Sequence, residues 1–137
     1  MTMTQEITIH NSPSELQRVA CFVEDIGNEL GLDGELLMNL NLALEEMVSN
    51  IIRHGKPQQA DDSIALKAEG NGEEITFTLS DNGIEFDPTT KGDLDTDVNP
   101  AERKLGGMGI FIVKNIMDQV TYQRLNSRNV VVMKKKL

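Results

Sequence analysis

The pattern of apolar and polar residues changes its period several times along the chain, and each change predicts a new element. Stretches in which the two kinds of residue alternate predict β-strands, which span residues 6–10, 64–68, 75–79, 120–125 and 130–134. Stretches with apolar residues three and four apart predict helices, which span residues 13–30, about 33–54 and about 109–117. The chain is therefore expected to combine five short strands with three helices.

Turn and cap residues mark the ends of these elements. Ser12, Pro13 and Glu15 suit the start of a helix, because oxygens of the side chains satisfy free amides and a carboxylate favours the positive end of the helix dipole. Gly31 suits its end. The pair Asn71-Gly72 predicts a hairpin turn, and a turn at 126–129 is predicted to join the last two strands.

The order of the elements predicts one domain over residues 1–137. Strands that alternate in polarity bury only one face, so we expect a mostly antiparallel sheet with three helices on that face, a two-layer α/β sandwich. The segment 81–105 is rich in Asp, Gly, Thr and Pro and has almost no apolar periodicity. Irregular segments of this length usually have a function of their own.

The charge balance excludes one class of function. The chain has 22 acidic residues against 13 basic ones, which gives a formal net charge of −9. Binding to nucleic acid requires clustered basic residues, and the only basic run is Lys134-Lys135-Lys136 at the end of the last predicted strand. We therefore expect no direct contact with nucleic acid.

The remaining composition indicates an ordinary cytoplasmic domain. A single cysteine, Cys21, cannot form an internal disulfide, and we expect it and Met38 to pack in the core. The first residues lack the pattern of a signal peptide. No apolar run reaches the roughly 18 residues that a membrane span needs, so no membrane association is expected.

The second predicted helix carries the first candidate for chemistry. Glu46 and Asn50 lie one turn apart, beside the apolar stripe of that helix. A carboxylate can accept a proton, and a carboxamide oxygen can contribute to a magnesium site in which phosphates and water supply the other ligands. The alternative is an ordinary solvated helix face. Glu45 points about 100° away and is a weaker candidate.

Two glycine-containing segments are further candidates. Asp81-Asn82-Gly83 follows a predicted strand, where a carboxylate can accept a hydrogen bond from the amino group of a ligand, although the same residues also form simple turns. Gly106-Gly107-Met108-Gly109 opens the third helix. Its backbone amides and the helix N-terminus can bind an anion, although the segment can equally be a hinge.

Together and in this order, these segments resemble the nucleotide site of the GHKL superfamily of ATPases, and most closely its anti-sigma factor serine kinases. The resemblance covers nearly the whole chain, from about Glu6 to Leu137. The segments that carry it are Glu46-Met-Val-Ser-Asn50-Ile-Ile-Arg-His54-Gly55, Asp81-Asn-Gly83-Ile-Glu-Phe-Asp-Pro88, Gly106-Gly-Met-Gly109-Ile-Phe-Ile-Val-Lys-Asn-Ile-Met-Asp118 and Asn129-Val-Val-Val-Met-Lys-Lys.

The resemblance implies the Bergerat fold of that superfamily and a role for each matching residue. Glu46 would be the general base that takes the proton from a serine hydroxyl, and Asn50 would hold the magnesium ion that bridges the ATP phosphates. Asp81 would accept a hydrogen bond from the adenine amino group, with Gly83 letting the base sit close. The nucleotide-binding residues expected in the glycine loop and the lid (87–105) are Gly106, Gly107, Met108, Gly109 and Arg103, the last with Lys104 as an alternative.

Two positions depart from the pattern of the family. Glu85 stands where many members have a second glycine, and Val132 is expected to stand where many relatives have a threonine that supports the adenine site. Arg18, in the first helix, matches a position that the family uses to bind partner proteins, although an exposed arginine is usually just solvated.

The resemblance implies an ATP- and magnesium-dependent serine kinase that phosphorylates an anti-anti-sigma protein and sequesters a sigma factor by partner switching. It also implies a homodimer, and the acidic surface suits a basic sigma factor. The alternative is a nucleotide-binding anti-sigma or switch module without kinase activity. The catalytic domain of a two-component histidine kinase is a third reading, against which stands the lack of a preceding dimerisation helix in these residues. A purely structural sandwich would leave the three motifs unexplained.

Overall fold

The side chains of each strand alternate between a buried and an open face, and this alternation organises the molecule. The computed structural model describes residues 2–54, 63–91 and 108–137. Its elements in chain order are β1 (Met3–His10), η1 (Pro13–Glu15), α1 (Leu16–Leu30), α2 (Gly34–His54), β2 (Ser63–Gly70), β3 (Glu74–Asp81), η2 (Pro88–Lys91), α4 (Met108–Ile116), β4 (Gln119–Leu125) and β5 (Arg128–Lys136).

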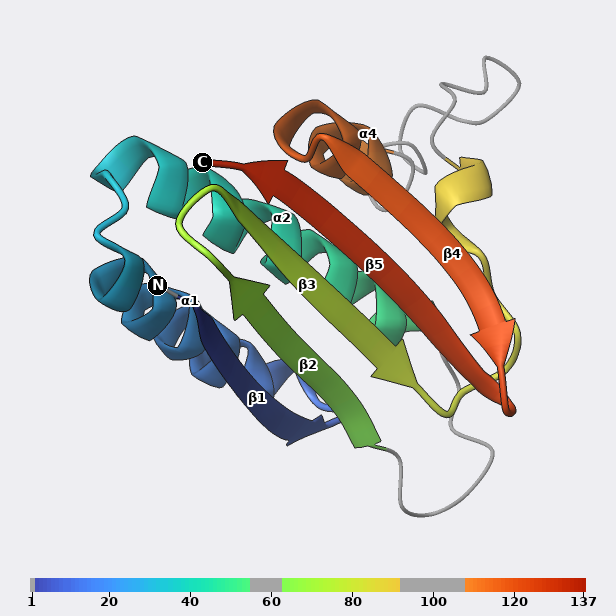
Figure 1. Ribbon diagram of the computed structural model, residues 1–137. Coiled ribbons are helices and arrows are strands. Elements are labelled where there is room, and N and C mark those ends of the chain that lie inside the picture. The colour runs from blue at the N-terminus through green and yellow to red at the C-terminus, as the bar shows by residue number, and fades with distance from the viewer. Residues whose placement is uncertain (1, 55–62, 92–107) are drawn as a thin grey trace.

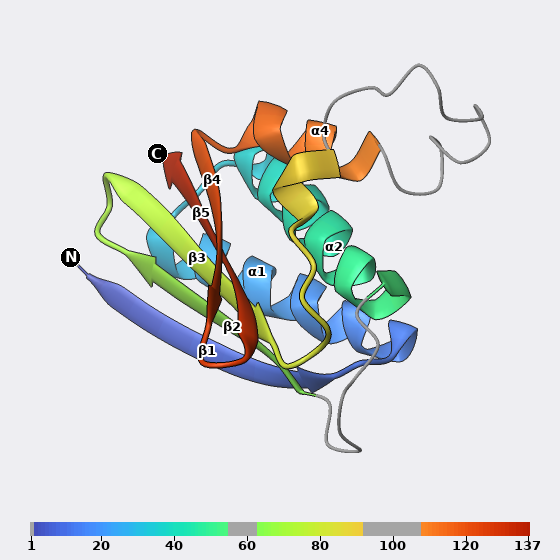
Figure 2. The ribbon, with the colours of Figure 1, turned by 90° about the vertical axis from the view of Figure 1, so that its right-hand side faces the viewer.

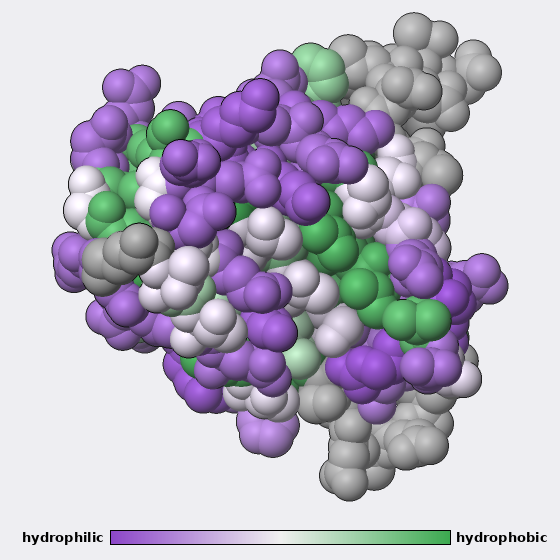
Figure 3. All heavy atoms as spheres, in the orientation of Figure 1, coloured by the Kyte–Doolittle hydropathy of each residue, from purple (hydrophilic) through white to green (hydrophobic). Residues whose placement is uncertain are grey.

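The five strands form one antiparallel sheet in the order β1-β2-β3-β5-β4 (Figure 1). The helices α1, α2 and α4 all cover the same face of this sheet, as the side view shows (Figure 2). The opposite face is open, and hydrophilic and neutral side chains dominate it (Figure 3). The predicted two-layer α/β sandwich is therefore confirmed, and every strand pairing among the described residues is antiparallel.

The core lies between the sheet and the helices. Its most deeply buried large side chains come from both layers: Phe77, Ile9, Ile26, Leu40, Leu44, Met47, Ile64, Leu66, Ile75, Leu79, Met133 and Val19. Gly31 ends α1 with a left-handed backbone (φ 68°), as predicted. Asp33 caps α2 by accepting a hydrogen bond from the amide of Leu36 at 2.8 Å.

Four details differ from the prediction. Ser12 makes no side-chain capping hydrogen bond, because its Oγ pairs with Oγ of Ser14 at 3.0 Å, and residues 13–15 form the 3-10 turn η1 ahead of α1, which begins at Leu16. The turn between β4 and β5 comprises only Asn126 and Ser127, both with positive φ (52° and 63°), so β5 begins at Arg128 instead of after residue 129. Two successive positive φ angles match the twist of a tight hairpin, which makes a longer turn unnecessary. Cys21 and Met38 are exposed, because each lies on the outer face of its helix.

The fold brings together the end of β3, the start of β5, and parts of α2 and α4. Asp81, the last residue of β3, lies directly opposite Asn129 of β5 in the strand register. Helix α2 crosses above this part of the sheet, and α4 packs against α2. None of the helices in the described ranges combines the length and the apolar composition that crossing a bilayer requires.

Candidate nucleotide site

The predicted face of α2 is present and lies at the edge of the core. Met47 and Val48 point into the core, whereas Glu46 and Asn50 are half-buried on the neighbouring face. The helical spacing places their side chains one turn apart. The structure therefore supplies an acidic and an amide group side by side at the border between core and solvent.

Asp81 is a buried carboxylate at the end of β3, with a relative exposure of 5%. Its Oδ1 accepts two hydrogen bonds, from the amide of Gly83 at 2.9 Å and from Nδ2 of Asn129 at 3.1 Å. Within the described part of the chain no donor reaches its second oxygen, Oδ2. Because a buried carboxylate needs hydrogen bonds, this oxygen is the one left to accept a hydrogen bond from a ligand.

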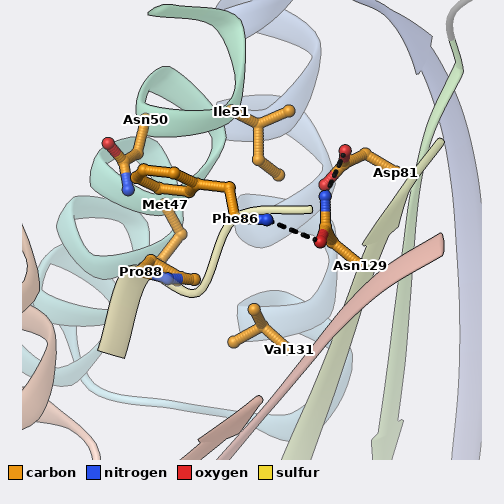
Figure 4. A pocket seen from close by; sticks show the side chains of 8 residues that line it. All are labelled: Met47, Asn50, Ile51, Asp81, Phe86, Pro88, Asn129 and Val131. Carbon is orange, nitrogen blue, oxygen red and sulfur yellow. Dashed lines mark hydrogen bonds between the residues drawn. The ribbon is translucent and has the colours of Figure 1, made fainter. Parts of the chain in front are cut away.

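Asn50 and Asp81 line the same cavity, although they come from different layers of the fold. The cavity has a volume of about 20 Å³, and its lining is formed by Met47, Asn50, Ile51, Asp81, Phe86, Pro88, Asn129 and Val131. Helix residues lie on one side and sheet residues on the other, with Phe86 and Pro88 between them (Figure 4). This volume is about that of one water molecule, so a purine base can enter only if lining side chains such as Phe86 or Pro88 move aside.

Glu46 meets the start of α4. A Cβ atom placed on Gly109 would lie 2.7 Å from the Oε2 atom of Glu46, so only a residue without a side chain leaves this carboxylate where it is. The first turn of a helix carries free amides and a positive potential, which suits an anionic ligand. The structure thus brings a potential base next to a potential phosphate site.

Several predicted site residues lie outside the described residues: Arg103, Lys104, Gly106 and Gly107. Met108 is the first residue of α4, and Gly83 is buried beside Asp81. The first part of the predicted lid forms η2, in which the carbonyl of Thr89 accepts a hydrogen bond from Nζ of Lys114 at 3.0 Å. This bond ties the beginning of that segment to α4.

The structure adds residues that sequence reasoning missed, and it corrects one position. Asn129, assigned to a turn, is a buried residue of β5 that bonds Asp81. Val132 does not stand beside the site: it faces the open side of the sheet, because it is paired with Thr78 and alternates with the buried Val131. The sequence does contain a signal for this position. Asn126-Ser127 alone can form a two-residue hairpin turn, which puts Asn129 two residues beyond the turn and inside the next strand.

The donor set suits a metal ion only together with a ligand. No group of three or more His, Cys, Asp or Glu side chains able to hold a metal ion occurs among the described residues. Asn50 offers one oxygen ligand beside the cavity. Magnesium commonly takes one or two protein ligands and completes its shell with phosphate oxygens and water, so the residues fit magnesium that arrives with a nucleotide.

Comparison with known proteins agrees with this geometry. Residues 9–135 match the model of the histidine kinase-like ATPase domain family. The chain belongs to this family. Among curated proteins, the domain is 25% identical over 125 residues to the serine-protein kinase RsbW of Listeria monocytogenes, a match that covers 87% of this chain and 80% of the relative. It is 28% identical over 104 residues to the anti-sigma F factor of Clostridium perfringens, which covers 75% of this chain and 74% of the relative.

Solved structures share the fold of this ATPase domain. The structure of the RsbU and RsbW domains of Rv1364c from Mycobacterium tuberculosis has a TM-score of 0.69 at 14% identity; the match covers 98% of this chain and 32% of that one. The histidine kinase domain of the Erythrobacter litoralis EL346 blue-light activated histidine kinase has a TM-score of 0.57 at 17% identity, covering 90% of this chain and 60% of that one. The resemblance to GHKL kinases inferred from the sequence is confirmed.

Proposed function

We propose that this domain is an ATP- and magnesium-dependent protein serine kinase that also acts as an anti-sigma factor. The observation that carries the proposal is the placement of Glu46 against Gly109 while Asn50, one turn along the same helix, shares a cavity with Asp81. The relatives named serine-protein kinase and anti-sigma F factor support both halves of the proposal.

Each described residue has a defined task in this proposal. Asp81 accepts a hydrogen bond from the adenine amino group, and the backbone at Gly83 permits the close approach of the base. The start of α4 at Gly109 lies near the phosphates, with Arg103, Gly106 and Gly107 expected to add contacts. Asn50 holds magnesium, which neutralises charge on the phosphates when it is bound.

Glu46 is the proposed base for the transfer step. The hydroxyl oxygen of the substrate serine attacks the γ-phosphorus of ATP, the bond from this phosphorus to the ADP oxygen breaks, and the serine proton passes to the carboxylate of Glu46. The products are phosphoserine and ADP. Because phosphoryl transfer depends mainly on positioning and charge stabilisation, a carboxylate on α2 held next to the start of α4 is enough for the protein to supply.

The proposed substrate is an anti-anti-sigma protein, and its phosphorylation releases the domain to hold a sigma factor. The net charge of −9 favours a basic partner surface. We further propose that the domain acts in the cytoplasm as a homodimer. The alternative is a nucleotide-binding anti-sigma module that performs no transfer, and the two differ only in whether Glu46 does chemistry.

The test is phosphoryl transfer from labelled ATP to candidate anti-anti-sigma proteins, with Glu46→Gln as the variant. We expect the wild-type protein to form phosphoserine, and Glu46→Gln to lose about 10²–10⁴-fold in rate while it still binds ATP. Glu45→Gln is the matched control, because Glu45 is exposed on a different face of α2. Equal rates for wild type and Glu46→Gln would refute the assigned base, and ATP binding without transfer by the wild type would favour the alternative.

A further inference from the structure

The carboxamide of Asn129 joins three segments of the chain beside Asp81. Its Nδ2 donates to Oδ1 of Asp81 at 3.1 Å and to the carbonyl of Ile84 at 2.8 Å. Its Oδ1 accepts from the amide of Phe86 at 3.1 Å, from the hydroxyl of Tyr122 at 2.6 Å and from Nη1 of Arg124 at 3.2 Å. Asn129 is only 4% exposed, so these bonds form away from solvent.

This set of partners requires an asparagine. The two acceptors, Asp81 and Ile84, need the two hydrogens of an amide nitrogen, and the three donors need its oxygen, so the amide has only one possible orientation. An aspartate would place an acceptor against Asp81, and a threonine offers only one hydrogen. The bonds therefore depend on this residue type at this position.

The same network fixes the backbone that follows Asp81. Arg124, which bonds Asn129, also donates from Nη1 to the carbonyl of Gly83 at 2.9 Å. The carbonyl of Ile84 and the amide of Phe86 are held by Asn129 itself. The segment 83–86 is thus attached to β4 and β5 at Gly83, Ile84 and Phe86, and Phe86 is one of the residues that line the cavity.

We propose that Asn129 is the positioning residue that makes this site selective for adenine. This inference rests on the proposed function. Asn129 and the amide of Gly83 both occupy Oδ1 of Asp81, which fixes the carboxylate and leaves Oδ2 as the acceptor for an exocyclic amino group. A base that carries a carbonyl oxygen at this place would set one acceptor against another, the Oδ2 of Asp81. Asn129 cannot donate to that carbonyl, because both hydrogens of its Nδ2 already bond Asp81 and Ile84.

The experiment compares the affinities for ATP and inosine triphosphate, which carries a carbonyl where adenine carries its amino group. Calorimetry with magnesium present measures both for the wild type and for Asn129→Asp. The wild type is expected to prefer ATP by at least about tenfold, the range of a hydrogen bond to a charged group. Asn129→Asp keeps the acceptor but places a second carboxylate next to Asp81, and its preference is expected to fall to within about threefold.

The matched control is Asn126→Asp, which makes the same chemical change in the same hairpin at an exposed residue. Its ratio of ATP to inosine triphosphate affinity is expected to equal that of the wild type. If Asn129→Asp fails to fold, Tyr122→Phe removes one bond to Asn129 without changing the ring, and the ratio is expected to fall by a smaller factor.

A double-mutant cycle then separates positioning from general stability. If Asn129 acts through Asp81, adding Asn129→Asp to Asp81→Ala leaves ATP affinity unchanged. A structural role instead lowers both affinities by the same factor and leaves their ratio intact, which would overturn this inference alone. Failure of the wild type to bind ATP would overturn the proposed function as well.

Discussion

The contact between Gly109 and Glu46 permits a substitution that moves the proposed base without removing it. In Gly109→Ala, the new Cβ would lie 2.7 Å from Oε2 of Glu46, whereas ordinary contacts begin at 3.4 Å. The carboxylate must therefore shift by about 0.7 Å, and it can do so because it is the end of a flexible side chain. The substitution changes the position of one functional group and leaves its chemistry intact.

The expected magnitude follows from this displacement. Misplacing a catalytic group by about 1 Å costs up to about 10²-fold, so we expect the transfer rate of Gly109→Ala to fall by about 10- to 100-fold, which corresponds to about 1.4–2.7 kcal/mol in the barrier. Stability should not fall, because alanine is favoured over glycine in a helix by up to about 1 kcal/mol. The two effects have opposite signs, which distinguishes displacement from unfolding.

Single-turnover transfer of labelled phosphate and thermal melting measure the two quantities. Gly34→Ala is the matched control, since Gly34 also lies at the start of a helix and nothing lies within 4 Å of its added Cβ. We expect the control to transfer at the wild-type rate. A wild-type rate for Gly109→Ala, with ATP affinity also unchanged, would refute the argument that Glu46 acts from the place where the structure puts it.

Three further predictions concern residues around the site. Burial, together with the charge of Glu85, raises the pKa of Tyr122 above the ordinary tyrosine value of 10.0. The folded state therefore favours the neutral phenol, and the stability that this preference contributes is lost as the pH rises from about 10 through the pKa of the folded protein. Tyr122 is the single tyrosine, so its absorbance titration should give a higher pKa in native than in urea-unfolded protein, and an equal or lower native pKa contradicts the burial argument. Phe86→Trp introduces the only tryptophan into the lining of the cavity, so its fluorescence should change on saturation with ATP. An unchanged spectrum with ATP bound would show that the base binds away from this residue. Arg18 is 55% exposed and lines an open groove of about 470 Å³ between β1 and α1. Arg18→Ala should therefore weaken the capture of a candidate sigma factor at least about fivefold in a pull-down titration, and leave ATP affinity unchanged. Equal capture by both proteins would remove Arg18 from the partner surface.

The layers of the fold could be predicted from the sequence, because an element that buries only one face must repeat its apolar residues with the period of its own secondary structure. Strands with one open face alternate, as β3 does, and helices that cover them carry one apolar stripe, as α1 does. The stop at Gly31 could be read from residue type, since few residues adopt a positive φ. The cap expected at Ser12 could not, because its hydroxyl pairs with Ser14 instead of a free amide.

The parts that could not be predicted depend on contacts between distant residues. Asn129 was assigned to a turn, because four consecutive polar residues favour a loop, yet two of them suffice for the hairpin and the strand register places Asn129 opposite Asp81. The family resemblance places Val132 beside the adenine site, but the register turns it to the open face, since a shift of one residue along a strand reverses the face to which a side chain points. The small volume of the cavity likewise arises from packing between α2, the sheet and the residues around Pro88.

The central claim is that Asn50 and Asp81 belong to one site for ATP and magnesium, and a calorimetric titration tests it most directly. ATP is titrated into the wild type with and without magnesium, and then into Asn50→Ala. We predict binding that is strengthened by magnesium in the wild type, and a loss of this strengthening in Asn50→Ala. No heat of binding at millimolar ATP, or the same magnesium dependence in both proteins, would contradict the claim.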